Sequence, residues 1–226
     1  MAPKPLTRRA VLGAGLALGV AGCASDDAEP EEPDAAARYG PDDPGAVVVR
    51  AREGWGAVPA RDGAVEHEVT RLTVHHSAYR LRDNARAAAQ LRSLQREHLG
   101  SGWPDIAYHY LVDLAGVVHE GRDPGTAGDS YTPYDTAGHL QVCLLGHFDA
   151  QPVTPAQLAG LTAILAWGAF HHGAGTDTIA GHGDHEPSTP CPGRNLTRIV
   201  HDGSLRAAVD RRLGEAEPRL VLLPPR

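Results

Sequence analysis

The pattern of apolar and polar residues predicts a series of strands in the middle of the chain. Val69–His75 alternates β-branched and polar side chains and runs into His75-His76-Ser77, where a strand gives way to a loop. The β-rich run Asp105–Asp113 and the run Val117–Gly121 flank the turn Ala115-Gly116, which predicts a hairpin. Shorter apolar runs predict two more strands, at Val47–Arg50 and Leu140–Leu145.

Apolar residues that recur with the period of an α-helix predict a helix over Asp83–Leu99, with Asp83 as its N-cap and Gly100 as its C-terminal stop. One stripe of this helix carries residues spaced at i, i+4, i+7 and i+11: Ala87, Leu91, Leu94 and His98. Because His98 continues the apolar stripe, we interpret it as a packed, hydrogen-bonded histidine and not as a metal ligand.

A second helix begins at Thr154-Pro155-Ala156-Gln157, which has the spacing of a capping box and a proline at the first helical position. It ends at His171-His172, where cations would complement the helix dipole, and we prefer that role to metal binding. A closing helix over Leu196–Leu213 and a loose tail, residues 216–226, complete the domain. The order of elements predicts one α/β (α+β) domain with a central mixed sheet flanked by helices.

The N-terminus differs in composition from this domain. Residues 1–22 combine a basic start, which includes Arg8-Arg9, with an apolar run too short to span a bilayer, as in a twin-arginine export signal. Val20-Ala21-Gly22-Cys23 looks like a lipobox, which predicts lipidation of Cys23. An ordinary secretion signal with an incidental cysteine is the alternative. We therefore expect an exported, membrane-anchored lipoprotein of the cell envelope.

Residues 23–45 carry eight acidic residues and one basic residue, Arg38, which predicts a disordered tether before a domain over residues 46–215. The chain has a net charge of −7. The signal contributes +3 and the tether −7, so about −3 remains for residues 46–226. A mildly acidic domain without a basic stripe argues against a nucleic-acid partner. We expect a monomer whose only link to the membrane is the lipid anchor.

The candidate chemistry lies in the turn-rich stretch Ala180–Arg194, whose prolines and glycines predict neither helix nor regular strand. His182 and Cys191 are nine residues apart, which is enough chain for both to reach one tetrahedral ion. His75, at a strand end, is the third candidate. Two imidazoles and one thiolate leave a fourth position open, as in catalytic zinc sites. The alternative is scattered polar loop residues, because the chain has 13 histidines.

The other cysteine of the domain, Cys143, lies in a buried-strand pattern and is interpreted as an inert core residue. A disulfide between Cys143 and Cys191 is the alternative.

Several motifs in one order resemble the type-2 N-acetylmuramoyl-L-alanine amidases, a family that includes amidase-type phage lysozymes and peptidoglycan recognition proteins. The resemblance covers about residues 50–195. The motifs that carry it are His75-His76-Ser77, Gly102-Trp103, Asp105-Ile106-Ala107-Tyr108-His109, Glu120-Gly121-Arg122, Val142-Cys143-Leu144-Leu145-Gly146, Gly181-His182 and Cys191-Pro192-Gly193.

The resemblance implies site residues one by one. His75, His182 and Cys191 would hold one Zn²⁺, Tyr108 would assist catalysis, and Thr189 takes the place of a lysine found in the phage enzymes. The chain departs from the family in two ways. The loop from His182 to Cys191 is one residue longer than in many members, and a histidine often found before the Val142 strand has no counterpart in residues 128–134.

The resemblance also implies hydrolysis of the amide between N-acetylmuramic acid and L-alanine, with peptidoglycan or muropeptides as the partner. The residues that bind the substrate are not identified. A non-catalytic peptidoglycan-binding protein is the main alternative, although such proteins usually lack the cysteine ligand that is present here. A zinc peptidase lacks support because the chain has no HExxH motif, and a serine hydrolase lacks it because no G-x-S-x-G elbow occurs.

Overall fold

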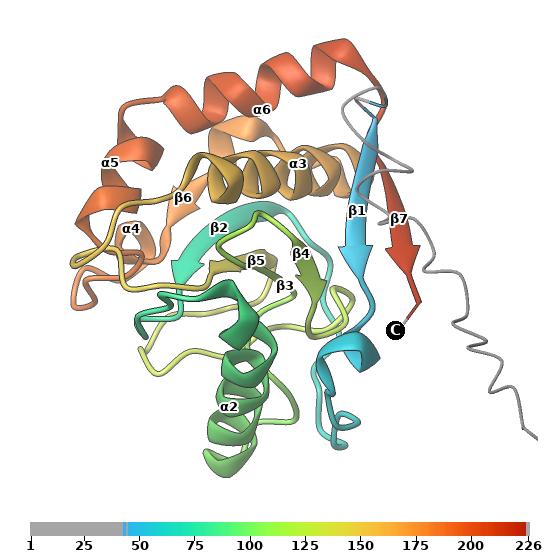
Figure 1. The fold of residues 1–226 in the computed structure, drawn as a ribbon, viewed down its shortest axis with the longest axis vertical. Coiled ribbons are helices and arrows are strands. Elements are labelled where there is room, and N and C mark those ends of the chain that lie inside the picture. Colours follow the sequence, from blue (N-terminus) through green and yellow to red (C-terminus); the bar gives the residue numbers. More distant parts are fainter. Residues whose placement is uncertain (1–42, 44, 225–226) are drawn as a thin grey trace, which may run out of the picture. The chain divides into compact units, whose positions relative to one another are not determined.

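The computed structural model describes residue 43 and residues 45–224 of the 226-residue chain. Its centre is one mixed sheet in the order β6-β2-β5-β3-β4-β1-β7 (Figure 1). All neighbouring strands run parallel except the hairpin β3/β4. The strands are β1 (Ala46–Arg50), β2 (Arg71–His76), β3 (Tyr110–Val112), β4 (Val118–Glu120), β5 (His139–Leu144), β6 (Ala180–Gly181) and β7 (Arg219–Leu223).

Helices cover both faces of the sheet: α2 lies on one side, and α3 and α6 lie together on the other (Figure 1). The α-helices are α2 (Ala87–Gly100), α3 (Pro155–His172), α4 (His182–His185), α5 (Arg194–His201) and α6 (Ser204–Glu215). The described residues also form three short 3₁₀ helices: η1 (Arg52–Trp55), η2 (Asn84–Arg86) and η3 (Thr176–Thr178). The predicted fold class, a single domain with a mixed sheet between helices, is therefore confirmed.

The alternation of side chains along the strands divides the apolar residues into two cores. In β5, Leu140, Val142 and Leu144 pack with α3, whereas Cys143 packs with α2 on the opposite face. Cys143 is fully buried and its thiol is free, as is that of Cys191, so the alternative disulfide is not formed.

Local signals predicted the helix starts well. Thr154 and Gln157 form the expected capping box, and Asp83 accepts a hydrogen bond from the Ala85 amide. The segment that Asp83 caps starts as the 3₁₀ turn η2 and continues as α2. His98 is buried, and its Nδ1 accepts a hydrogen bond from the Ala107 amide at 3.0 Å, as its place on the apolar stripe predicted.

Strand β3 is shorter than the predicted run Asp105–Asp113. An arginine side chain forms hydrogen bonds with backbone carbonyls at the start of this run, so those carbonyls are not available to a neighbouring strand. The Arg122 guanidinium donates to the carbonyls of Asp105 (3.0 Å) and Ile106 (2.8 Å). The Asp105 carboxylate accepts from Arg52 (2.7 Å) and Gln95 (2.7 Å). These contacts hold the start of the run as an irregular segment.

The predicted helix Leu196–Leu213 is two helices, α5 and α6, separated at Asp202-Gly203. Gly203 has φ +78°, which ends regular helix, and the Asp202 carboxylate accepts a hydrogen bond from the Ser204 amide at 2.9 Å. The tail that was predicted to be loose is also different: β7 pairs with β1 over five residues and is the edge strand on that side of the sheet. The predicted signal, lipobox and tether up to residue 42 lie outside the described residues.

Candidate metal centre

Strand β2 brings His75 to the side of the sheet that α2 covers. Leu72 and Val74 enter the core with α3, so the intervening Thr73 and His75 project to the other face. His75 lies beside Cys143 of β5 and is only 2% exposed. Its Nε2 is buried and has no hydrogen-bond partner.

The stretch Ala180–Arg194 was predicted to contain neither strand nor helix, and this was wrong for its first part. Ala180 and Gly181 pair with β2 as the edge strand β6, and α4 follows as a single turn. Because these two residues pair with β2, they form a strand even though their own sequence pattern does not predict one. This pairing also places His182 beside the end of β2. The Gly183 amide then donates to the Cys191 carbonyl at 2.7 Å, which folds the stretch back on itself.

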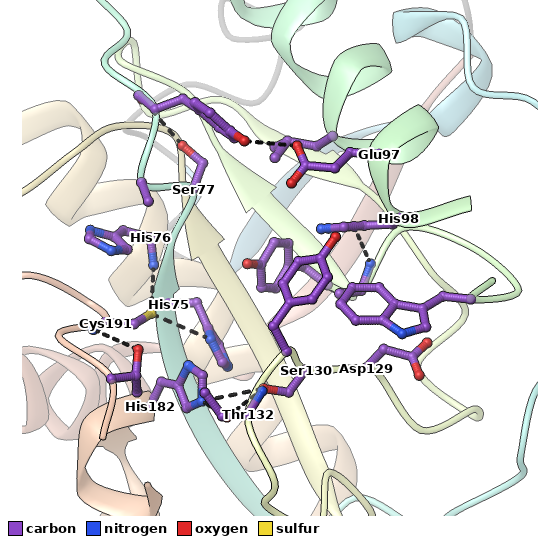
Figure 2. Close-up of a pocket in the computed structure, with 18 of the residues that line it drawn as sticks. His75, His76, Ser77, Glu97, His98, Asp129, Ser130, Thr132, His182 and Cys191 are labelled. Carbon is purple, nitrogen blue, oxygen red and sulfur yellow. Dashed lines mark hydrogen bonds between the residues drawn. The ribbon is translucent and has the colours of Figure 1, made fainter. Parts of the chain in front are cut away.

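The structure brings the three predicted ligands together (Figure 2). The distance from His75 Nδ1 to Cys191 Sγ is 3.7 Å, and the ring centroids of His75 and His182 are 4.8 Å apart. One donor atom from each of the three residues lies within 4.8 Å of the others. His75 and Cys191 are more than a hundred residues apart in the sequence. They come together because β6 pairs with β2.

The protonation of the cluster suits a metal ion. Burial, with a smaller contribution from His182, lowers the pKa of His75 well below its usual value, and burial lowers the pKa of His182 to about 4. Both imidazoles are therefore neutral at pH 7 and offer lone pairs. Burial raises the pKa of Cys191 to about 12, so the thiolate needs a cation beside it. Two neutral imidazoles and one thiolate, formed when a bound cation displaces the Cys191 proton, are a donor set that zinc prefers, and these residues fit it.

A threonine that the sequence did not single out contacts His182. Thr132 Oγ1 lies 2.7 Å from His182 Nε2, and Ser130 Oγ lies 3.4 Å from the same atom. Because Nε2 is used in this way, Nδ1 of His182 is the nitrogen left for a ligand. The signal in the sequence was the stretch of residues 128–134, where the family histidine is missing and residues with hydroxyl groups, such as Ser130 and Thr132, are present.

Tyr108 lies against the cluster, with its ring centroid 5.2 Å from that of His75. Burial raises the pKa of Tyr108 well above its usual value, so its hydroxyl stays protonated and can donate a hydrogen bond. Thr189 also reaches the cavity, but its hydroxyl accepts a hydrogen bond from the Cys191 amide at 3.2 Å. That contact supports the turn that carries Cys191.

The cluster opens into a cavity of about 320 Å³ between α2 and the loop that carries Thr132. Figure 2 shows His98 on the α2 side of this cavity, across from His75 and His182. An aromatic wall lies beside His98: the rings of Trp103 and Tyr131 contact each other at a tilt of 40°, with centroids 4.4 Å apart. The cavity therefore combines a metal-type donor set, a tyrosine hydroxyl and apolar aromatic surface.

Comparison with known proteins decides the family. Residues 65–194, more than half of the chain, match the family described as N-acetylmuramoyl-L-alanine amidase. The chain belongs to this family. An endolysin of Enterobacteria phage K11 is 31% identical over 146 residues, which cover 61% of this chain and 89% of that protein. The N-acetylmuramoyl-L-alanine amidase of Sus scrofa is 31% identical over 163 residues, which cover 69% of this chain but only 27% of that longer protein.

A solved structure shows the same fold. Peptidoglycan recognition protein-LE, in complex with tracheal cytotoxin (monomeric diaminopimelic acid-type peptidoglycan), aligns with a TM-score of 0.62 at 26% identity. The alignment covers 68% of this chain and 92% of that one. The chain is thus similar both to proteins named as enzymes and to a protein named as a recognition protein. Within residues 43 and 45–224, no helix is both long and apolar enough to cross a membrane.

Proposed function

We propose that the protein is a zinc-dependent N-acetylmuramoyl-L-alanine amidase, which hydrolyses the amide between N-acetylmuramic acid and L-alanine in peptidoglycan. The observation that carries the proposal is the complete set of three donors, His75, His182 and Cys191, at the base of a cavity. Relatives named as an endolysin and as an amidase support hydrolysis, and the relative bound to monomeric peptidoglycan supports the substrate class.

His75, His182 and Cys191 would hold the zinc ion. Bound zinc polarises a carbonyl and lowers the pKa of water toward 7. The remaining chemistry belongs to the side chains of the chain itself. The neutral hydroxyl of Tyr108, which lies beside His75, is placed to donate a hydrogen bond to the carbonyl oxygen as charge develops on it.

Other residues orient these groups. The Thr132 hydroxyl holds the His182 ring at Nε2, which fixes the tautomer that presents Nδ1. Thr189 supports the backbone of Cys191 and carries no charge, so we assign it a smaller role than Tyr108. The wall of Trp103 and Tyr131 offers an apolar surface for the part of the substrate that does not react.

The test is digestion of purified cell-wall sacculi with the zinc-loaded protein. Release of free stem peptides with a new N-terminal alanine is the expected result, and chelation followed by zinc addition should abolish and restore it. The matched control is His171→Ala, which alters an exposed histidine outside the cavity. If zinc-loaded protein binds sacculi but releases no peptide, the chain is a recognition protein and the proposal is wrong.

We also propose that Cys23 anchors the mature protein in a membrane of the cell envelope after twin-arginine export. Support comes only from the sequence around Arg8-Arg9 and Val20–Cys23. Cells producing wild type or Cys23→Ala should be fractionated. The wild type should sediment with membranes and the variant should be soluble, whereas equal partition of the two would contradict the anchor.

A further inference from the structure

The neighbour of His75 in the chain belongs to a second cluster. His76 is the last residue of β2, and its ring points away from that of His75 (Figure 2). Although His76 also lines the cavity, its ring neighbour Phe148 belongs to the core that packs with α3. His76 is 6% exposed, and its ring lies 6.3 Å from that of Phe148 and 5.6 Å from that of His147. His76 is not one of the three donors, His75, His182 and Cys191, of the cavity described above.

Three metal-type donors converge here. One ligand atom each from His76, His147 and Asp149 lies within 4.8 Å of the other two. His147 Nδ1 lies 3.9 Å from Asp149 Oδ2, too far for a hydrogen bond. This nitrogen is buried and has no hydrogen-bond partner. A buried nitrogen left unpaired costs free energy, which a bound ion would recover.

The backbone around the cluster holds these donors in place. The Asn195 amide donates to the Phe148 carbonyl at 3.0 Å, and the Arg194 amide donates to Asp149 Oδ1 at 3.0 Å. The Arg194 side chain approaches the same oxygen at 3.4 Å but is largely exposed, and Oδ2 is left on the His147 side. The Arg194 amide and nearby charges lower the pKa of Asp149, so it is a carboxylate at neutral pH.

We propose that His76, His147 and Asp149 form a second metal site, which binds a divalent transition ion such as zinc. Two imidazoles and one carboxylate are ligands that zinc and its neighbours in the first transition row accept. The site contains no thiolate and is more exposed than the first, so we expect weaker binding. Although His76 also lines the cavity, the two donor sets share no residue, because consecutive residues of a strand project to opposite faces.

The position of this second site gives it a structural role. An ion there would join the end of β2 to the loop between β5 and α3. That loop is in turn hydrogen-bonded to Arg194 and Asn195, which follow the ligand Cys191 closely in the chain. The His76 amide also donates a hydrogen bond to Cys191 Sγ at 3.5 Å. Occupation of the second site would therefore stabilise the segment that carries Cys191.

The experiment measures bound zinc by equilibrium dialysis and elemental analysis. All proteins are full-length chains that carry Cys23→Ser, which removes the remaining thiol outside the described residues. The background protein should bind two zinc ions, the weaker of which is lost in His147→Ala and in Asp149→Asn. The control His171→Ala should keep both. Zinc above the concentration that fills the first site should raise the Tm of the background protein but not that of Asp149→Asn.

The outcomes separate this proposal from the proposed function. If the background protein binds one ion and Cys191→Ser binds none, the second site does not exist and the catalytic site stands. If two ions bind and both remain in His147→Ala and Asp149→Asn, the second site is wrongly placed. If Cys191→Ser keeps two ions, the catalytic ligand set is wrong instead. Circular dichroism of each variant confirms that it is folded.

Discussion

The two consecutive histidines of β2 have different surroundings. His75 faces a cavity with a thiol, a second imidazole and a tyrosine, and it is 2% exposed. His76 faces a less buried group with a carboxylate donor, held by the loop after β5. Each group contains an imidazole nitrogen that is buried without a partner, at His75 Nε2 and at His147 Nδ1. Two consecutive residues of one strand therefore belong to two donor sets, one with a soft thiolate ligand and one with a harder carboxylate ligand. The sequence His75-His76 alone does not show this difference.

The largest expected effect separates the two groups by activity. Cys191→Ser replaces the thiolate with a hydroxyl, a poor zinc ligand at neutral pH, so zinc at the first site and amidase activity should be lost together. His171→Ala, which lies outside both clusters, should keep both. Elemental analysis and release of stem peptides from sacculi check this. Full cleavage by Cys191→Ser would remove Cys191 from the catalytic site.

Tyr108→Phe tests whether the cavity side of β2 does more than bind metal. Loss of a hydrogen bond to the developing oxyanion typically lowers the rate by ~10²–10³. The phenyl ring keeps the packing against His75, so zinc content and Tm should stay near those of the wild type. The measurement is kcat on a soluble muropeptide beside zinc content. A parallel fall in zinc would mean that Tyr108 acts through the ligands.

His109 provides a reference histidine whose two nitrogens are both paired, unlike those at the two clusters. Its Nδ1 accepts from the Gln141 amide at 2.8 Å and its Nε2 donates to the Thr126 carbonyl at 2.9 Å. Burial lowers its pKa to about 3. Because the unfolded chain binds this proton more readily, the contribution of His109 to stability is full above about pH 6.5 and is lost as the pH falls toward 3.

The expected loss from this one group between pH 7 and pH 4 is about 3 kcal/mol in the free energy of unfolding. Urea unfolding at both pH values measures it. His109→Gln keeps an acceptor and a donor but cannot titrate, so its stability should depend less on pH than that of the wild type. Equal pH dependence of the two proteins would show that His109 is not protonated on unfolding.

Thr132→Val removes the hydroxyl that contacts His182 Nε2 while it keeps the shape of the side chain. Loss of such a second partner of a ligating histidine typically lowers metal affinity by about 10–100-fold. Zinc affinity, measured by competition with a chelator, should fall by this amount, and Thr132→Ser should restore it. The weaker second site should be unaffected. An unchanged affinity in Thr132→Val would show that the 2.7 Å contact does not orient the ring.

Thr189→Ala should have the smallest effect in the series. Its hydroxyl accepts one backbone hydrogen bond at the edge of the cavity, where water can replace it. We expect zinc content to be retained and activity to fall by only a few-fold, since one neutral hydrogen bond is worth about 1 kcal/mol. Stem-peptide release measures this. A loss as large as that of Tyr108→Phe would place Thr189 on the substrate.

Much of the fold could be predicted because it depends on local signals. The capping box at Thr154, the hairpin around Ala115-Gly116 and the apolar stripe with His98 were all confirmed. The three donors at His75, His182 and Cys191 were predicted as a set and do lie together. Their role as zinc ligands stays a prediction, as do the roles of Tyr108 and Thr189.

The errors arose where distant residues decide the local structure. Arg122 takes backbone carbonyls that would have extended β3, and β1 turns the predicted loose tail into β7. The short strand β6 exists only because β2 lies beside it. The sequence pattern within these segments carries no information about the distant residues that contact them, so periodicity could not predict their secondary structure.

The sequence by itself determined the order of the elements and the types of donor available, because side-chain period, caps and turn residues act over a few positions. The tertiary structure decided how closely His75 approaches Cys191, that Thr132 holds His182, and that His147 and Asp149 meet His76. These outcomes depend on strand pairing and loop placement across tens of residues, and contacts at that range exist only once the chain has folded.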